Sequence, residues 1–115
     1  MDPRFVEAGS SWYVSPVAGE RDKVIKAGAG KLFYIRVANT AAAVRYIFIV
    51  NDDDVAAVGT DLLSPPIPIA ANGMVELKLP YPITYGTGLL LSMSTTQTSY
   101  TAGGANDGHY HALFK

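Results

Sequence analysis

The feature that most constrains this chain is a succession of short segments in which the side chains alternate in polarity, without a stretch of helical periodicity. In a strand every second side chain lies on the same face, so this alternation predicts β-structure. About eight such segments are present, separated by turn-forming Gly, Pro, Asn and Asp: residues 12–14, 22–26, 31–37, 44–50, 65–69, 74–79, 88–94 and 109–114. We therefore expect an all-β fold, a single antiparallel β-sandwich of jelly-roll type.

The segment 31–37 is the first strong strand. Phe33, Ile35 and Val37 are predicted to share its core face, because they alternate along the chain. Residues 22–26 precede it across a glycine-rich turn, in which the glycines can adopt positive φ. We expect these two segments to pair with each other in one sheet.

Proline and glycine mark the ends of other strands. An Asn-Gly pair at 72–73 is the strongest hairpin signal in the chain, and residues 74–79 follow it as a strand. Pro80 and Pro82 are predicted to end that strand, because proline has no N–H group to donate. For the same reason the prolines of 65–69 restrict that segment to the edge of a sheet.

The 115 residues suffice for one domain, so we expect one sandwich spanning residues 1–115. Residues 1–11 are polar and weakly patterned, and are expected to form an extended N-terminal arm that orders on a partner. The absence of cysteine excludes disulfide scaffolds, zinc–thiolate sites and thiol catalysis. We recognise no secretory signal and no membrane-spanning run, so we expect synthesis in the cytoplasm and no membrane partner.

The charges nearly cancel, with nine basic and ten acidic residues. A general electrostatic attraction to nucleic acid or to anionic lipid is therefore not expected. The distribution is uneven: residues 1–50 hold seven of the nine basic residues, and residues 51–115 hold six of the ten acids. Either this is ordinary solvated charge, or it gives subunits complementary edges for assembly.

His109 and His111 are the only histidines, and they lie two residues apart in the last predicted strand. Both rings therefore point to one face. This spacing can hold a metal ion, with Asp107 as a third ligand or with one histidine from each chain on a trimer axis. The alternative is a solvated pair, since a full zinc site usually has three or four ligands. We predict no metal and no cofactor, and keep His109 and His111 as the candidates.

Three further motifs are incomplete. Residues 27–31 lack the first glycine and the Ser or Thr of a phosphate-binding loop. The acids 52–54 lack the alternating ligands and the distal glutamate of a calcium loop, and are typical of a solvated turn. No serine lies in a Gly-x-Ser-x-Gly elbow. We therefore expect a protein that is not an enzyme.

The segment 44–50 is apolar on both faces, which predicts a central strand covered on each side. The second cover could be a neighbouring subunit. Arg45, Ile47 and Ile49 share one face of this strand, so they are candidate interface residues.

Tyr81 and Tyr85 are further interface candidates. They lie, like Tyr100, outside the clearest strands. These tyrosines either contact a partner or a glycan, or cap the ends of the sandwich.

Residues 24–40 read VIKAGAGKLFYIRVANT, and small residues separate them from Val44-Arg45-Tyr46. This pattern resembles one in small virion proteins of tailed bacteriophages, in which K-x-G-x-G-x-L-(Y/F)-x-(I/L)-x-V-x-N-T precedes a small-residue spacer and (V/A)-R-Y-(L/I). The stretch IPIAANG at 67–73 and the final strand closed by Lys115 are also similar. The resemblance covers roughly residues 22–115 and concerns a scaffold, so it brings no catalytic residues.

The resemblance implies a non-enzymatic virion structural protein, most simply a capsid cement or decoration protein on the outer capsid surface. Such a protein would bind the major capsid protein as a homotrimer and stabilise the head by bridging capsid subunits. The acids 52–54 and the prolines of 65–68 depart from the pattern and mark a candidate contact loop.

Two alternatives stay open. A minor tail or fibre component would bind a host-surface glycan, and an aromatic surface cluster would favour it. An unrelated small binding domain or enzyme would be favoured by a deep pocket with perturbed titratable groups.

Overall fold

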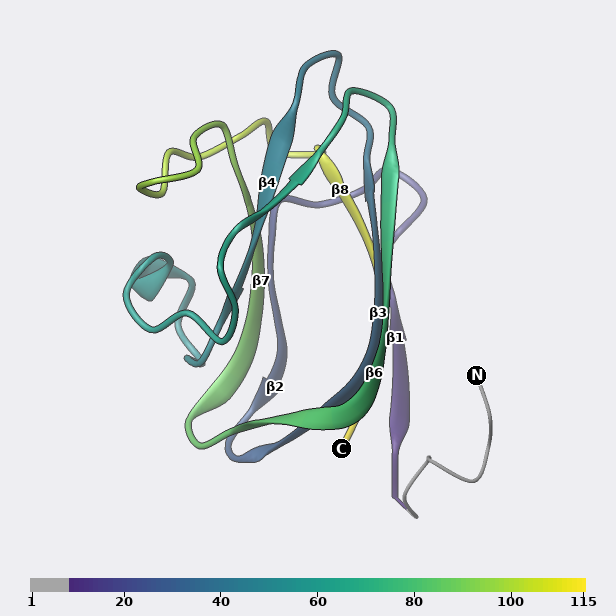
Figure 1. The fold of residues 1–115 in the computed structure, drawn as a ribbon, viewed down its shortest axis with the longest axis vertical. Coiled ribbons are helices and arrows are strands. Elements are labelled where there is room, and N and C mark those ends of the chain that lie inside the picture. Colours follow the sequence, from purple (N-terminus) through teal and green to yellow (C-terminus); the bar gives the residue numbers. More distant parts are fainter. Residues whose placement is uncertain (1–8) are drawn as a thin grey trace.

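The computed structural model describes residues 9–115. It contains eight strands in this range, with one short 3-10 turn, η2 (Val55–Ala57) (Figure 1). The predicted arm of residues 1–11 lies mostly outside the described residues, and its last residue, Ser11, begins the first strand. The strands are β1 (Ser11–Val14), β2 (Asp22–Ala27), β3 (Gly30–Asn39), β4 (Arg45–Val50), β5 (Ile67–Ile69), β6 (Met74–Tyr85), β7 (Gly88–Ser94) and β8 (Gly108–Phe114).

The strands form two four-stranded antiparallel sheets that pack face to face (Figure 1). The order is β1-β8-β3-β6 in one sheet and β2-β7-β4-β5 in the other. Four of the strand pairs are those expected when one long hairpin is rolled into a sandwich: β1–β8, β2–β7, β3–β6 and β4–β5. Two further pairs, β3–β8 and β4–β7, complete the two sheets. This is the jelly-roll arrangement, so the predicted fold class is confirmed.

The main core lies between the two sheets. Alternate residues of β7 face it, as the sequence predicts, and they meet alternate residues of β3, β4 and β8. Burial of these apolar side chains is the main stabilising contribution to the fold. Its fully buried members include Leu32, Ile35, Ile47, Ile49, Leu89, Leu91, Met93 and Tyr110.

A β-bulge in β3 changes the predicted faces of that strand. The register of β3 with both neighbours shifts between Leu32 and Tyr34, and relative to β8 Phe33 is an extra residue in the ladder. Leu32 therefore joins Ile35 and Val37 in the main core, and Phe33 packs with Tyr34 in a separate cluster. The prediction that Phe33 shares the core face with Ile35 and Val37 is wrong, because one inserted residue reverses the alternation.

Two turns cross from one sheet to the other instead of forming hairpins. β2 pairs with β7, so the predicted pairing of residues 22–26 with residues 31–37 is wrong. Asn72, at φ 56°, and Gly73, whose N–H donates to the Ala70 carbonyl at 2.9 Å, do form a tight turn. That turn joins β5 of one sheet to β6 of the other, so the predicted hairpin is also wrong. A turn signal indicates a reversal of the chain but not the partner of the next strand.

β6 continues through Pro80 and Pro82, so the predicted end of the strand at these residues is wrong. β6 is an edge strand, where a missing N–H group is tolerated. The ladder with β3 is nevertheless interrupted, because the pairing passes directly from Lys78 to Ile83 on the β6 side. On the other sheet Pro68 lies in the edge strand β5, as predicted.

Candidate binding face

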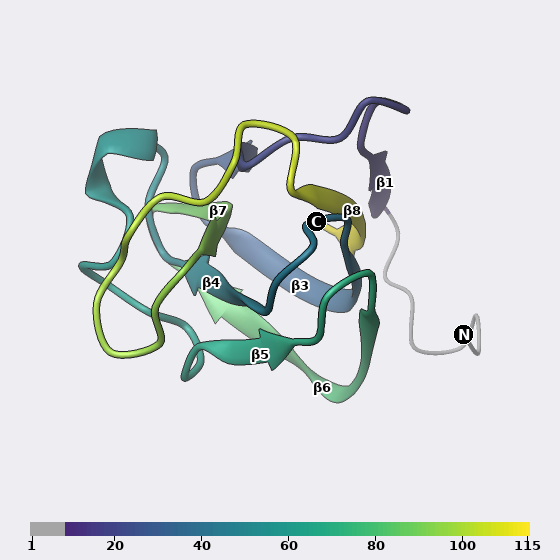
Figure 2. The ribbon, with the colours of Figure 1, turned by 90° about the horizontal axis from the view of Figure 1, so that it is seen from above.

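The two outer faces of the sandwich differ in how much of the chain lies over them. Two long loops, residues 51–66 and 95–107, cover the outer face of the β2-β7-β4-β5 sheet (Figures 1 and 2). Tyr100 packs edge-on against Phe48, with ring centroids 5.6 Å apart, and Val58 packs on the same cluster. The outward apolar residues of β4 and β7 are therefore buried by the chain itself.

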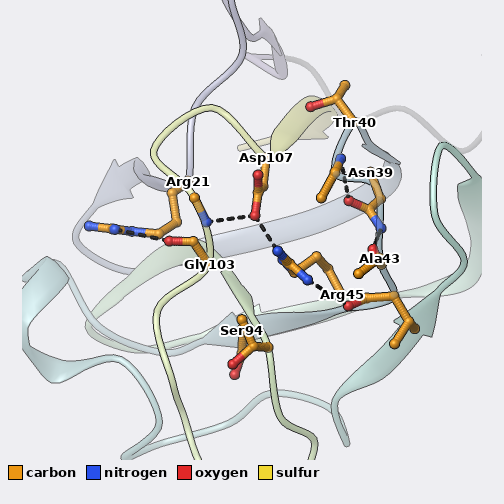
Figure 3. Close-up of polar contacts among 12 residues, drawn as sticks. Arg21, Asn39, Thr40, Ala43, Arg45, Ser94, Gly103 and Asp107 are labelled. Atoms are coloured by element: carbon orange, nitrogen blue, oxygen red, sulfur yellow. Dashed lines mark hydrogen bonds and ion pairs between the residues drawn. The ribbon is translucent and has the colours of Figure 1, made fainter.

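Polar contacts fasten the loop 95–107 to the strands beneath it (Figure 3). Arg45 Nε donates to Asp107 Oδ2 at 2.8 Å, and these side chains are only 18% and 14% exposed. Arg21 Nη1 donates to the Gly103 carbonyl at 3.3 Å. If the loop moved away, the charge of Arg45 would stay largely buried without its partner, which would destabilise the fold. These contacts therefore keep the loop over its sheet.

No long loop of residues 9–115 covers the outer face of the β1-β8-β3-β6 sheet (Figure 1). Within this range, only the short loop after β1 reaches this face, at His109. Val14 and Met74 on this face are 64% and 58% exposed. Val14 lies on β1 and Met74 on β6, the two edge strands of this sheet. Exposed apolar side chains on a face that no long loop covers make that face a candidate interaction site. The strand register sets the side chains in rows across the sheet: Val14, His111, Arg36 and Glu76 form one row, and His109, Ala38 and Met74 form the next.

An open groove of about 380 Å³ lies among these rows, and we call it the outer groove. Arg36 makes no hydrogen bond or ion pair with any of the described residues. Glu76, which faces Arg36 in the register, instead accepts a hydrogen bond from the Tyr34 hydroxyl. A guanidinium that makes no hydrogen bond, beside exposed apolar side chains, is suited to bind a carboxylate, although the Glu76 carboxylate also interacts with it electrostatically. The outer groove is lined by Val14, Arg36, Ala38, Met74, His109 and His111.

An aromatic cluster lies beside the outer groove. The Trp12 ring centroid is 4.7 Å from that of His111 and 5.8 Å from that of Tyr34. Burial and the hydrogen bond to Glu76 raise the pKa of Tyr34, and the same hydrogen bond lowers the pKa of Glu76. Trp12 is the only tryptophan and is 53% exposed, so its fluorescence reports on this face.

The structure corrects the interface predicted on β4. Ile47 and Ile49 are fully buried and belong to the main core, so they offer no surface to a neighbouring subunit. The Arg45 guanidinium forms an ion pair with Asp107 of the same chain. Both faces of β4 are covered, as expected, but the second cover is made by loops of the same chain.

The two tyrosine candidates differ in exposure: Tyr85 is buried and Tyr81 is exposed. Tyr85 is 3% exposed, its hydroxyl donates to the Lys115 carbonyl at 3.1 Å, and burial raises its pKa to about 12. It therefore ties strands together at one end of the sandwich and is not a contact residue. Tyr81 is 83% exposed, and it alone among the five interface candidates exposes most of its surface.

His109 and His111 share one face, as predicted, and both line the outer groove. Nε2 of His109 lies 2.7 Å from the Val17 carbonyl oxygen, and His111 packs in the aromatic cluster. The predicted third ligand, Asp107, binds Arg45 instead. Within the described part of the chain, no three His, Asp or Glu side chains come close enough to hold a metal ion.

The acids 52–54 form the turn that the sequence predicts. Oδ1 of Asp52 accepts from the N–H groups of Asp53 and Asp54, at 2.8 and 3.0 Å. Asp54 then caps η2 by accepting from the Ala56 N–H at 2.9 Å. The carboxylate of Asp53 makes no hydrogen bond or ion pair with residues 9–115.

The strongest pKa shifts belong to tyrosines. Burial, with a hydrogen bond to Glu20, raises the pKa of Tyr13 to about 12, and burial raises that of Tyr110 well above its usual value. The Tyr110 hydroxyl donates to the Arg21 carbonyl at 2.5 Å. A tyrosine that is held protonated by burial and by an acceptor is a structural group, so these shifts indicate no acid–base pair.

Sequence reasoning missed the outer groove. Val14 and Met74 each fall in a predicted strand, but their exposure depends on which sheet the long loops cover. One signal was present: Arg36, His109 and His111 occupy outward positions of two strong strands. The register of the two strands is needed to show that they meet.

No known family, curated protein or solved structure matches this chain significantly. No helix in the described residues is long and apolar enough to cross a membrane.

Proposed function

We propose that this protein is a non-enzymatic structural component of a tailed-bacteriophage virion, a decoration or cement protein on the outer surface of the head. The sequence resemblance over roughly residues 22–115 supports this class. A jelly roll of two packed sheets is a rigid module for such a role. In this proposal the partner is the major capsid protein, and the protein bridges capsid subunits as an oligomer. The homotrimer implied by the resemblance stays a prediction.

The observation that carries the proposal is the unequal covering of the two sheets. One apolar outer face is buried by loops of the chain, and the other leaves Trp12, Val14 and Met74 between 53% and 64% exposed. Burying one large apolar side chain contributes about 1.5–3 kcal/mol, part of which offsets the entropy lost on association. A binding protein needs such a face.

The composition of this face suits a protein partner. Aromatic residues, methionine and arginine are enriched in the buried centres of protein interfaces, and Trp12, Arg36 and Met74 are of these types. All three lie on strands of one sheet, so their positions are fixed before a partner binds. A face that is already ordered loses little entropy on binding.

Co-sedimentation with phage heads tests the proposal. The purified chain is mixed with heads that lack it, prepared from the phage that encodes it. Val14→Asp and Met74→Asp are each expected to weaken binding at least about tenfold, because a charge replaces an apolar contact. The control is Val44→Asp, which changes a 42% exposed valine before β4 and should bind as the unaltered chain does.

Two outcomes would contradict the proposal. If the unaltered chain does not sediment with heads, the location on the head is wrong. If Val14→Asp and Met74→Asp bind as tightly as the control variant, heads are bound through another surface. Melting curves accompany each variant, and substitution of these exposed residues is expected to change stability by no more than about 1 kcal/mol.

A second function, glycan binding by a tail or fibre module, is favoured by one observation. Trp12 is half exposed, and Arg36 and Glu76 lie close by on the same face. Sugar rings stack on exposed aromatic rings, and planar charged groups bind their hydroxyls. A saturable change of Trp12 fluorescence with bacterial surface glycans, weakened by Glu76→Ala, would favour this function over head binding.

A further inference from the structure

We propose that the outer groove of one copy binds the loop of residues 52–62 of a second copy, so that copies associate head to tail. We call these residues the acidic loop. The inference deepens the proposed function, since it rests on the outer groove being a protein-binding site and names the chain itself as one partner.

The acidic loop combines negative charge with exposed apolar side chains. Asp53, Asp54 and Asp61 are exposed, and Val55 and Leu62 beside them are 50% and 37% exposed. An acidic surface with apolar residues is complementary to a groove that holds exposed apolar side chains and a guanidinium without a hydrogen bond. The loop also coincides with the acids 52–54, which depart from the phage-protein pattern.

Hydrogen bonds close the base of the acidic loop. At its base the Asn51 N–H donates to the Asp61 carbonyl at 2.7 Å, and the Leu63 N–H donates to the Ile49 carbonyl at 2.7 Å. Val58 packs on the apolar cluster of β4 and β7. These contacts restrict the loop before it binds, which reduces the conformational entropy lost on binding.

The central contact of the proposal joins Arg36 of one copy to Asp53 of the next. Neither side chain has a hydrogen bond or ion pair within residues 9–115, so binding breaks no hydrogen bond, and the electrostatic interaction of Arg36 with Glu76 is the one it must compete with. Val14 and Met74 would enclose Arg36 and face Val55, which removes water from around the ion pair. Charge-assisted hydrogen bonds of this kind are among the strongest at interfaces.

The groove is lined by residues of the β1-β8-β3-β6 sheet, and the acidic loop lies on the side of the other sheet (Figures 1 and 2). The η2 turn of the loop projects from the β2-β7-β4-β5 side, and the groove opens on the β1-β8-β3-β6 side. The contact therefore joins two different surfaces of neighbouring copies, which makes it heterologous. Each copy can bind one neighbour through its groove and another through its loop. A ring of three needs two surfaces at a sharp angle, so this contact favours a row or a wide ring.

Charge reversal at each surface tests the contact by light scattering over a range of protein concentrations. Arg36→Glu and Asp53→Lys should each raise the dissociation constant of self-association at least about thirtyfold, because like charges then face each other. An equal mixture of the two variants should associate again, since each mixed contact joins opposite charges. The matched control is Lys78→Glu, which makes the same charge change as Arg36→Glu at a 68% exposed side chain outside the groove.

The mixture also shows that both variants are folded, because unfolded chains would not recover association. A groove-to-groove contact predicts that Asp53→Lys associates like the unaltered chain, and that result overturns the proposal. A monomer at every concentration overturns it as well. Head binding is scored separately: variants that lose self-association but still sediment with heads would leave the proposed function intact.

Discussion

Asn39, at the end of β3, is the polar side chain whose loss should affect stability most. It is 1% exposed, and its Nδ2 donates to the carbonyls of Ala43, Ile69 and Ala70 at 2.9, 3.1 and 3.1 Å. Its Oδ1 accepts from the Ala41 N–H at 2.9 Å. The contact with Ala43 is visible in Figure 3. One amide thus joins the turn before β4 to the turn after β5.

The magnitude follows from these bonds. The amide has two N–H hydrogens, so one of them is shared between two of the three carbonyls, and we count three net hydrogen bonds. Each contributes about 1 kcal/mol to the net stability, and a buried carbonyl left without a donor costs more. Asn39→Ala should therefore lower the free energy of unfolding by about 3 kcal/mol, a large share of the 5–15 kcal/mol typical of a domain.

Asn39→Asp sharpens the test. The carboxylate has the size of the amide but cannot donate, so at neutral pH it faces three carbonyl oxygens and its pKa must rise above the usual value of about 3.9. At pH values between the pKa of the introduced carboxyl group in the unfolded chain and its higher pKa in the folded chain, the folded state binds more protons than the unfolded state. The stability of Asn39→Asp relative to the unaltered chain should therefore fall as the pH rises from about 4.

Urea denaturation, followed by the fluorescence of Trp12, measures both effects. The control is Thr40→Ala, which removes an exposed hydrogen bond of 2.9 Å to the Asn106 carbonyl and should cost less than about 1 kcal/mol. A loss below about 1 kcal/mol for Asn39→Ala would refute the counting of three net bonds. A stability difference for Asn39→Asp that does not change with pH would refute the buried-carboxylate argument.

Two further predictions concern the tyrosines and the glycines. The folded protein should ionise in alkali in at least two steps, and stability should be full below about pH 10 and be lost as the pH rises towards 12, because the unfolded chain releases these protons first. One single absorbance step near pH 10 before unfolding would contradict this. Gly30→Ala places a Cβ 2.0 Å from the Lys115 carbonyl oxygen and should cost at least about 2 kcal/mol, whereas Gly86→Ala meets nothing within 4 Å. Equal melting temperatures of these two variants would exclude the steric argument. The tyrosines with a raised pKa are Tyr13, Tyr34, Tyr85, Tyr100 and Tyr110.

The strands themselves were predictable from the sequence, because the alternation that defines a strand is local. Leu89, Leu91 and Met93 face the core as their spacing predicts, and Pro68 lies in an edge strand because it lacks an N–H group. The pairing of strands was not predictable in the same way. Asn72 takes the positive φ that its Asn-Gly pair predicts, yet the turn crosses between sheets, and only the packing of two whole sheets decides this.

Phe33 shows a second limit of pattern analysis. The segment around it alternates without a visible fault, and nothing in residues 31–37 marks the bulge. The bulge arises from the register with two neighbouring strands, one of which contains Pro80 and Pro82 opposite the shifted position. A single extra residue then exchanges Leu32 for Phe33 in the core. Sequence patterns therefore predict the faces of a strand only as far as its ladder is regular.

The binding face was hidden from the sequence for a related reason. Ile47 lies in a strand with two apolar faces, which indicates two covers but does not say whether the second belongs to the chain or to a partner. Arg36 and His111 make the outer face of the opposite sheet look polar in the sequence, and a polar face by itself predicts contact with solvent. The apolar character of that face comes from Val14 and Met74, which adjoin Arg36 only through the register of four strands. The interface prediction therefore moves from β4 to the opposite sheet, because the long loops cover the more apolar face and leave the mixed one free for a partner.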